Sequence, residues 1–218
     1  LPGKVLREVL NKPLLEYQIE RVRRVKNINK IVIATTTNEI DQPIVDVCKR
    51  LSIPYFRGSE QDVLARYFKA AEAFQANIIV RLTADCPIID SNVIEKVIDY
   101  YMKGKGKYDY VSNTLLRSYP RGMDTEVFSI ESLKAAYLES TSILEREHVT
   151  PFIFKDPERF RLANVSYEGN ESKYRLTVDT IEDFNLISEI IEMLYPNNQY
   201  FSLEDTLKLI NTCPRLTS

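Results

Sequence analysis

The segment ANIIVRLTADCPIID, residues 76–90, joins an apolar, β-branched run to an acidic turn. The run predicts the most buried strand of the chain. Pro87 cannot donate to a strand ladder, so the strand is expected to end at Asp85. Side chains alternate faces along a strand, which would place Arg81, Thr83 and Asp85 on one face. The segment therefore predicts a central strand that ends in a carboxylate, at the edge where open α/β sheets bind ligands.

The sequence before and after this strand alternates between strand and helix patterns. We expect strands at 28–37, 53–58 and 76–85, and helices at 12–25, 44–52, 63–74 and 91–102. This alternation predicts one α/β domain over residues 1–218, with a mostly parallel, doubly wound sheet.

After residue 102 the pattern changes, and residues 105–170 are expected to form an antiparallel addition to the sheet. Its strands are predicted at 108–113, 124–129 and 160–167, with helices at 132–140 and 142–154. A further strand at 174–179 precedes a helix that starts at Thr180 and Asp183, and a last helix covers 202–211.

The five-residue pattern of residues 81–85, Arg-Leu-Thr-x-Asp, returns at residues 175–179. Asp179 thus also follows a predicted strand, and two such strands side by side would bring Asp85 and Asp179 together. Two carboxylates in one cleft repel each other unless a cation lies between them. Few, hard oxygen ligands suit Mg²⁺ held jointly with phosphate oxygens. The alternative is that each Asp only ends a strand and caps the next turn; for the pair we favour a metal site.

The loop LPGK, residues 1–4, places Gly3 and Lys4 before an apolar stretch. It is not a Walker A loop, because Val5 stands where that motif has Ser or Thr. Beside a metal, Lys4 would neutralise the charge of a triphosphate; by itself it could equally be a surface lysine.

Composition excludes several classes of protein. The net charge of −2 gives no electrostatic footprint for a nucleic-acid partner. No apolar run reaches the ~20 residues that cross a membrane. The chain has three cysteines, no C-x-x-C pattern and one histidine, His148, which argues against zinc. Reduced thiols in a cytoplasmic protein are the simplest interpretation.

Taken together, the motifs resemble bacterial cytidylyltransferases of the spore-coat polysaccharide biosynthesis type. These belong to the superfamily of acylneuraminate and 3-deoxy-manno-octulosonate cytidylyltransferases. The matching segments run in order along most of the chain: LPGKVL (1–6), KPLLEYQIER (12–21), VIATTT (32–37), GSEQDVLARY (58–67), RLTADCPIID (81–90), RGMDTEVFS (121–129), REHVTPFI (146–153) and YRLTVDTIEDF (174–184).

The resemblance implies a nucleotide-diphospho-sugar transferase-like fold and Mg²⁺-dependent transfer of CMP from CTP to a sugar hydroxyl, with release of pyrophosphate. It implies that Lys4, Asp85 and Asp179 are catalytic and that both aspartates hold the metal. The residues implied to bind the nucleotide are Pro2, Gly3, Lys4, Thr35, Thr36, Thr37, Ser59, Asp62, Arg66 and Thr83. Those implied to bind the acceptor, a small sugar and by preference a sugar acid, are Arg121, Asp124 and Glu126. Arg175, four residues before Asp179, is a further substrate-binding candidate from its position, and either binds phosphate or pairs with the carboxylate.

The resemblance also implies a homodimer, with residues 105–170 contributing to the acceptor pocket and the dimer contact. It further implies that a first strand and a glycine-rich loop precede Leu1, with that strand inside the sheet.

Two other classes of function stay open at this stage. One is a different enzyme on the same scaffold, either another nucleotidyltransferase or a glycosyltransferase. The other is a nucleotide-binding protein without catalysis. Pyrophosphate release separates nucleotidyl transfer from glycosyl transfer, since the latter produces none.

Overall fold

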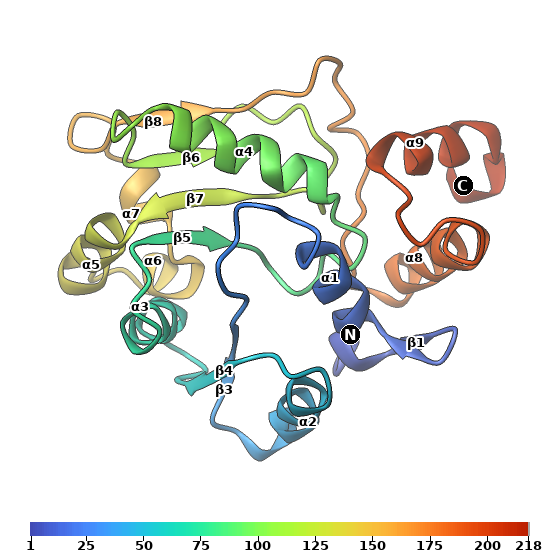
Figure 1. The fold of residues 1–218 in the computed structure, drawn as a ribbon, viewed down its shortest axis with the longest axis horizontal. Helices are drawn as coiled ribbons and strands as arrows, with labels where there is room; N and C mark the ends of the chain where they lie inside the picture. Colours follow the sequence, from blue (N-terminus) through green and yellow to red (C-terminus); the bar gives the residue numbers. More distant parts are fainter. Residues whose placement is uncertain (218) are drawn as a thin grey trace.

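A computed structural model describes residues 1–217, and Ser218 lies outside the described residues. The α/β prediction is confirmed (Figure 1). The strands are β1 (Glu8–Val9), β2 (Lys12–Pro13), β3 (Ile33–Thr36), β4 (Tyr55–Gly58), β5 (Ile78–Arg81), β6 (Tyr110–Ser112), β7 (Glu126–Ser129) and β8 (Leu162–Asn164). The helices are α1 (Leu14–Val22), α2 (Gln42–Arg50), α3 (Val63–Ala73), α4 (Ser91–Lys103), α5 (Ile130–Glu139), α6 (Ile143–His148), α7 (Pro151–Phe154), α8 (Ile181–Leu194) and α9 (Leu203–Thr212). Short 3-10 turns cover η1 (Lys4–Leu6), η2 (Glu39–Asp41) and η3 (Pro214–Thr217).

The largest sheet is mixed, with the strand order β5-β7-β6-β8. Strand β7 runs antiparallel to β5 and β6, whereas β8 pairs with β6 in parallel. The prediction that residues 105–170 form an antiparallel addition is therefore correct for β7 and wrong for the pair of β6 and β8. Strands β3 and β4 form a separate parallel pair, and β1 and β2 form a short hairpin.

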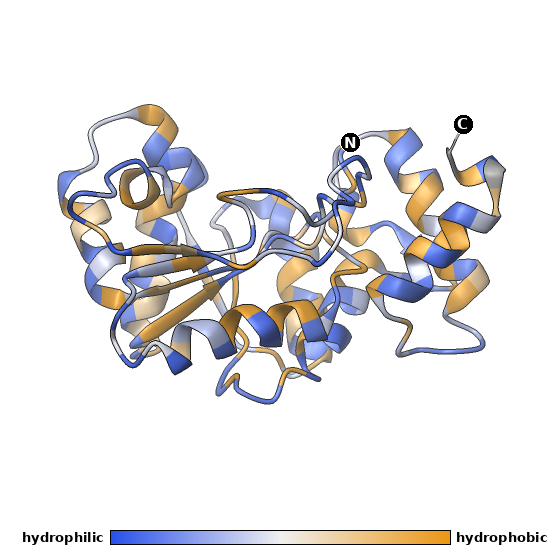
Figure 2. Cartoon of the chain, turned by 90° about the horizontal axis from the view of Figure 1, so that it is seen from above, coloured by the Kyte–Doolittle hydropathy of each residue, from blue (hydrophilic) through white to orange (hydrophobic). Residues whose placement is uncertain are grey.

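Helices cover both faces of the four-stranded sheet (Figure 2). Val111 and Val127 lie in one core cluster with side chains of α4, α8 and α9. Their strand neighbours Tyr110 and Phe128 lie in a second cluster with side chains of α3 and α5. This is the alternation that a strand with both faces buried requires. None of the helices within residues 1–217 combines the length and apolar content of a membrane span.

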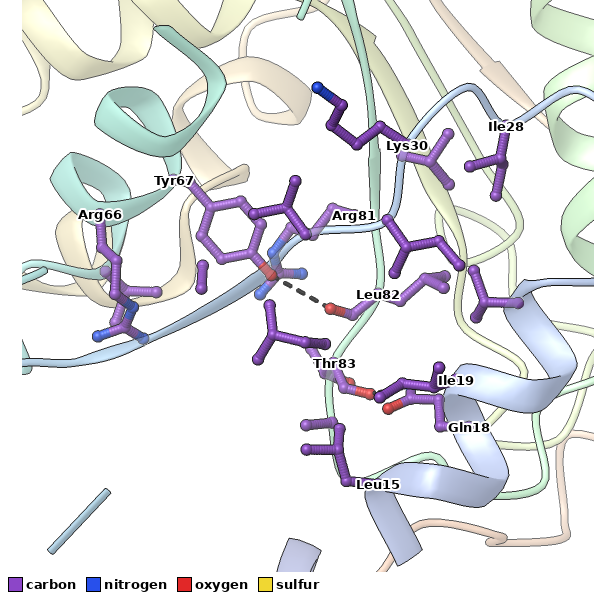
Figure 3. Close-up of a pocket in the computed structure, with 18 of the residues that line it drawn as sticks. Leu15, Gln18, Ile19, Ile28, Lys30, Arg66, Tyr67, Arg81, Leu82 and Thr83 are labelled. Carbon is purple, nitrogen blue, oxygen red and sulfur yellow. Dashed lines mark hydrogen bonds between the residues drawn. The ribbon is translucent and has the colours of Figure 1, made fainter. Parts of the chain in front are cut away.

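A cavity of about 410 Å³ separates β3 from β5 (Figure 3). Within residues 1–217, β3 pairs only with β4 and β5 only with β7, so one edge of each strand faces the cavity without a strand partner. Side chains take up part of the exposed backbone: Tyr67 donates to the Leu82 carbonyl at 3.1 Å, and Gln18 to the Thr83 carbonyl at 2.7 Å. The rest of the lining is mainly apolar and comes from α1, α3 and residues 28–34.

Both Arg-Leu-Thr-x-Asp segments differ from their predicted form. Strand β5 ends at Arg81, so Asp85 lies in the loop beyond the strand and not at its end. Residues 174–179 form no strand and make a single bridge between Arg121 and Arg175. Neither stretch is held by a ladder of strand hydrogen bonds. Both are instead anchored by buried side chains, since Cys86 and Leu176 are only 2% and 1% exposed.

Local helix signals agree with the structure. Thr180 and Asp183 form a full capping box on α8, as predicted, and Asp90 caps α4. The helix predicted over 142–154 is instead two helices, because Val149 adopts a positive φ of 73° between them. Pro151 then begins α7 at a position where its missing N–H has no cost.

Candidate active site

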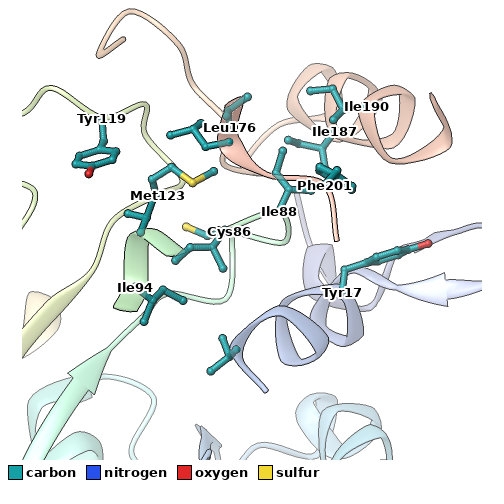
Figure 4. Close-up of a cluster of buried hydrophobic side chains, with 14 of the residues drawn as sticks. Tyr17, Cys86, Ile88, Ile94, Tyr119, Met123, Leu176, Ile187, Ile190 and Phe201 are labelled. Carbon is teal, nitrogen blue, oxygen red and sulfur yellow. The ribbon is translucent and has the colours of Figure 1, made fainter. Parts of the chain in front are cut away.

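Three segments that are distant in sequence meet beside the C-terminal end of β5. The Val178 amide donates to the Asp85 carbonyl at 2.8 Å, which places the segment before Asp179 against the loop that carries Asp85. Below this contact, Cys86, Met123, Leu176 and Ile187 lie together in the core (Figure 4). The segments that carry the two aspartates are therefore adjacent along the backbone, although neither aspartate lies at a strand end. That their carboxylates share one cleft stays a prediction.

Cations already surround Asp179. Lys4 Nζ donates to its Oδ1 at 2.6 Å, and the Arg175 guanidinium donates to its Oδ2. The hydrogen bond from Lys4, together with the nearby positive charges, lowers the pKa of Asp179 below its ordinary value. The carboxylate keeps 42% of its exposure, so it is accessible to a ligand as well as ionised.

Asp85 has a different environment. Its half-buried carboxylate accepts only a weak hydrogen bond, from Cys86 Sγ at 3.6 Å, and makes no ion pair with any described residue. Burial and the neighbouring Asp85 charge raise the pKa of the Cys86 thiol, which therefore stays neutral. A half-buried carboxylate without a counterion among the described residues is a suitable ligand for an added cation.

The donor set fits Mg²⁺. No group of three or more acidic, His or Cys side chains able to hold a metal occurs among residues 1–217. A protein-only cage is therefore not offered here, whereas Mg²⁺ commonly takes one or two carboxylates and completes its shell with water and phosphate oxygens. Asp85 and Asp179 are the residues that would hold it.

The LPGK loop reaches the site through a left-handed turn. Gly3 has φ 64°, which glycine adopts without strain, and its carbonyl accepts from the Leu6 amide at 2.9 Å. This turn starts η1 and directs Lys4 onto Asp179. Pro2 and Gly3 are exposed beside it. The predicted proximity of Lys4 to the aspartates is thus present in the structure.

The predicted base-contacting threonines lie at the end of β3. Thr35 and Thr36 donate their hydroxyls to Asp41 at 3.2 and 2.5 Å, and the Thr37 amide donates to the Gly58 carbonyl at 3.0 Å. The role of Asp41 as the acceptor for these hydroxyls was not predicted from the sequence. The only indication was its position, a few residues after the three threonines.

The predicted residues of the 59–66 segment form a network at the start of α3. Asp62 caps the helix through the Ala65 amide at 2.9 Å and pairs with Arg146, so its carboxylate is already committed. Arg66 donates to the Ser59 carbonyl and borders the cavity, and its buried Nε has no hydrogen-bond partner within residues 1–217. Thr83 lines the same cavity from the opposite side. Of these residues, Arg66 and Thr83 line the β3–β5 cavity, and none of the four forms a hydrogen bond or ion pair with Asp85 or Asp179 within residues 1–217.

The predicted acceptor residues divide into two groups. Arg121 and Arg175 are bridge partners, and Arg175 contacts Asp179 directly. Asp124 forms a bidentate pair with Arg117 at 2.7 and 2.8 Å. The pairing of Arg117 with Asp124 has no signal in the sequence.

Glu126 is the exception. It is 7% exposed on β7 and accepts from Tyr110 and Thr150, each at 2.6 Å, and from the Arg81 guanidinium. Burial acts to lower the pKa of Arg81, but the Glu126 carboxylate raises it above its ordinary value. The prediction that Glu126 faces an acceptor does not match this environment, because the carboxylate is buried and its partners are internal: two lie in the sheet and Thr150 lies just before α7.

A family model described as cytidylyltransferase matches residues 1–207. The chain belongs to the cytidylyltransferase family. The resemblance found in the sequence is thereby confirmed, and with it the coarse activity of a nucleotidyltransferase.

Three relatives give the scale of similarity. The spore coat polysaccharide biosynthesis protein SpsF of Bacillus subtilis is 32% identical over 208 residues, covering 88% of this cytidylyltransferase chain and 81% of SpsF. A solved cytidylyltransferase from Leptospira borgpetersenii is 33% identical, with a TM-score of 0.94 over 99% of this chain and 90% of that one. A CMP:2-keto-3-deoxy-manno-octonic acid synthetase solved with CTP is 14% identical, with a TM-score of 0.64 over 88% and 93% of the two chains, which shows the shared fold.

Replacing Lys4 should change the titration of Asp179. In Lys4→Met, the pKa of Asp179 should rise toward its ordinary value, because the largest cause of its depression is removed. A depressed carboxylate pKa gives stability that is present above the ordinary pKa and is lost as pH falls through the depressed one, so this acid-labile contribution should shrink. Carbon-13 NMR titration of the Asp179 carboxyl measures the shift. Lys49→Met, on the exposed side of α2, is the control, and equal titration curves for the two variants would contradict the assignment.

Replacing Glu126 should lower the free energy of unfolding and should not act mainly on affinity for the acceptor. Glu126→Gln leaves the Arg81 charge buried without its counterion, which costs about 3–5 kcal/mol in the free energy of unfolding. Glu139→Gln removes a carboxylate from a solvent-exposed pair with Arg159 and should change the free energy of unfolding far less, because water screens such pairs. Urea unfolding compares the two. A Glu126→Gln protein of unchanged stability but weakened acceptor affinity would restore the binding role.

Proposed function

We propose that this protein transfers CMP from CTP to a hydroxyl group of a sugar acid, releases pyrophosphate and requires Mg²⁺. The observation that carries the proposal is the convergence of Lys4, Asp85 and Asp179, held by the contact between Val178 and Asp85. Family membership supports the nucleotidyl chemistry. The names of the SpsF and octonic acid synthetase relatives support a sugar acid used in polysaccharide biosynthesis.

In this reaction the acceptor hydroxyl forms a bond to the α-phosphorus of CTP, and the bond to the β-phosphate oxygen breaks. The phosphates carry the charge that must be offset, so catalysis is mainly positioning and electrostatics. Lys4 supplies a positive charge at the site, on a turn that the backbone fixes. Bound Mg²⁺ would supply further neutralisation of phosphate charge. Asp85 and Asp179 position that cation, and their loops are anchored by the buried side chains of Cys86 and Leu176.

The test is a nucleotide panel followed by a turnover assay. CTP with Mg²⁺ should raise the melting temperature, since a ligand at 100 times its Kd stabilises the folded state by about 2.7 kcal/mol. UTP, ATP and GTP should not. Pyrophosphate release with sugar acids should fall about 100-fold or more in Asp85→Asn and Asp179→Asn. Asp46→Asn, on the exposed side of α2, is the control.

Two results would count against the proposal. A CTP-dependent melting shift without pyrophosphate from any acceptor would favour a binding protein. Consumption of a finished nucleotide sugar without pyrophosphate would favour a glycosyltransferase.

We also propose that sequence upstream of Leu1 contributes a strand that fills the cavity between β3 and β5. The unpaired edges of both strands face the cavity, and the buried Nε atoms of Arg66 and Arg81 lack a partner among the described residues. A strand would provide backbone groups for the edges and acceptors for these donors.

Adding the upstream sequence to residues 1–218 should therefore raise the melting temperature by several degrees and protect β3 and β5 amides from hydrogen exchange. An extension of equal length with its apolar residues replaced by Ser is the control. Equal protection of the β3 and β5 amides from hydrogen exchange in both proteins would contradict the proposal that a strand fills this cavity.

Cytoplasmic location and a homodimer stay predictions from the sequence. Sedimentation of the purified protein measures the second.

A further inference from the structure

The loop that carries Asp85 is held on both sides by one helix. On α1, the buried Gln18 donates to the Thr83 carbonyl at 2.7 Å, just before Asp85 in the chain. One turn later on α1, the buried Arg21 donates through Nη1 to the Ile89 carbonyl at 3.5 Å, just after Asp85. Side chains three residues apart lie on the same face of a helix. Two donors on one face of α1 therefore bracket the residue proposed to hold Mg²⁺.

Arg21 also joins this loop to the C-terminal helices. Its Nη1 donates to the Phe201 carbonyl at 3.0 Å, and the guanidinium lies 3.9 Å from the centroid of the Phe201 ring. Phe201 stands between α8 and α9 and belongs to the same buried cluster as Ile88 (Figure 4). A single side chain thus connects α1, the loop after β5 and the segment that leads into α9.

Asp90 fixes the far end of the loop. Its Oδ1 accepts from the Asn92 amide at 2.7 Å and caps α4, while its Oδ2 accepts from the Leu203 amide at 2.6 Å in the first turn of α9. The N-terminus of a helix carries partial positive charge, so both helices stabilise this buried carboxylate. Together with the bond from Val178 to the Asp85 carbonyl, these contacts leave neither end of the 85–90 loop free.

The charge of Arg21 has no counterpart that packing would explain. The side chain is 3% exposed, forms no ion pair within residues 1–217, and its Nη2 has no hydrogen-bond partner there. Burial, with a smaller effect of the Arg24 charge, lowers the pKa of Arg21 to about 10, so it remains protonated at neutral pH. A buried charge without a counterion destabilises a fold. What Arg21 adds over an apolar side chain is its bonds to two carbonyl groups.

The two aspartates of the site depend on the backbone to different degrees. The Asp179 carboxylate is held directly by Lys4 and Arg175. The Asp85 carboxylate accepts only the weak bond from Cys86 Sγ. The position of Asp85 therefore depends mainly on how its own loop is supported.

We propose that Arg21, assisted by Gln18, is a positioning residue that sets the affinity for the catalytic cation by holding the loop that carries Asp85. This inference rests on the proposed function and adds residues that act through the backbone. Neither side chain is expected to contact the cation, CTP or the acceptor.

Metal binding can be measured without turnover. Mn²⁺ replaces Mg²⁺ at carboxylate sites, and electron paramagnetic resonance measures the free Mn²⁺ in the presence of full-length protein and CTP, with no acceptor. In Arg21→Met, the Kd for Mn²⁺ should rise about 10-fold or more, as is usual when the support of a metal ligand is removed. The affinity for CTP without metal should stay unchanged.

Two milder variants keep the test valid if Arg21→Met does not fold. Arg21→Lys keeps the charge but cannot reach both carbonyl groups, so its Kd for Mn²⁺ should lie between those of Arg21→Met and the original protein. Gln18→Leu removes the support before Asp85 and should raise the Kd in the same direction.

Hydrogen exchange locates the effect. The Ile89 and Val178 amides donate to the carbonyls of Cys86 and Asp85 at 3.3 and 2.8 Å. In Arg21→Met both amides should exchange faster through local opening of the loop, whereas the amides of β7 should change only with global stability.

Two controls separate position from stability. Ile153→Val removes a methyl group from the second core cluster, where it lowers stability away from the Asp85 loop. Arg159→Lys makes the same exchange as Arg21→Lys in an exposed pair. Both proteins should bind Mn²⁺ as the original does.

Each outcome decides the inference. If Arg21→Lys and Gln18→Leu keep the original Kd for Mn²⁺, the inference is overturned and the proposed function stands. A Kd raised equally by Ile153→Val would make the effect one of stability and would also overturn it. An original protein that binds CTP but no Mn²⁺ overturns the proposed metal site, and the inference with it.

Discussion

The hydrogen bond from the Val178 amide to the Asp85 carbonyl is the contact on which the site depends. It joins the loop after β5 to the segment before α8, neither of which belongs to a regular strand. Its geometry is maintained from below, where Cys86 and Leu176 are buried in one core with Met123 and Ile187. Apolar burial thus fixes the backbone of the two segments that carry Asp85 and Asp179. Loss of this packing would displace the two segments at the site and also lower the free energy of unfolding.

The two Arg-Leu-Thr-x-Asp segments have the same letters and different roles. Arg81 is directed away from Asp85 and neutralises Glu126 inside the sheet, which leaves Asp85 without a cation. Arg175 instead turns to Asp179 in the same segment. The difference follows from β5, since Arg81 is its last residue and pairs with Glu126 across the ladder. Residue 175 has only a single bridge, so its side chain is free to reach its own segment.

Much of the fold could be predicted from local signals in the sequence. Apolar periodicity located the helices, and the capping residues Thr180 and Asp183 marked the start of α8, because these interactions lie within a few residues. The prediction of a strand at 174–179 was wrong. Its β-branched residues suit a buried extended segment equally well, and only the neighbouring chain segments decide whether a strand ladder forms. For the same reason the sequence could place Lys4, Asp85 and Asp179 in one site but could not show that Asp62 pairs with Arg146, or that Glu126 is buried with Arg81. Those partners are distant in the chain and have no spacing rule.

The cavity between β3 and β5 also leaves the chain open to pairing with other molecules. Unpaired strand edges are templates for pairing with any extended segment, including one from another molecule. Here two such edges face each other across an apolar slot, so a segment that enters can be bonded on both sides. The same geometry that would make the slot selective for one strand makes intermolecular β-pairing its competitor. An extended segment of a second molecule would meet the same two edges, so the slot is where pairing between molecules of this fold would begin.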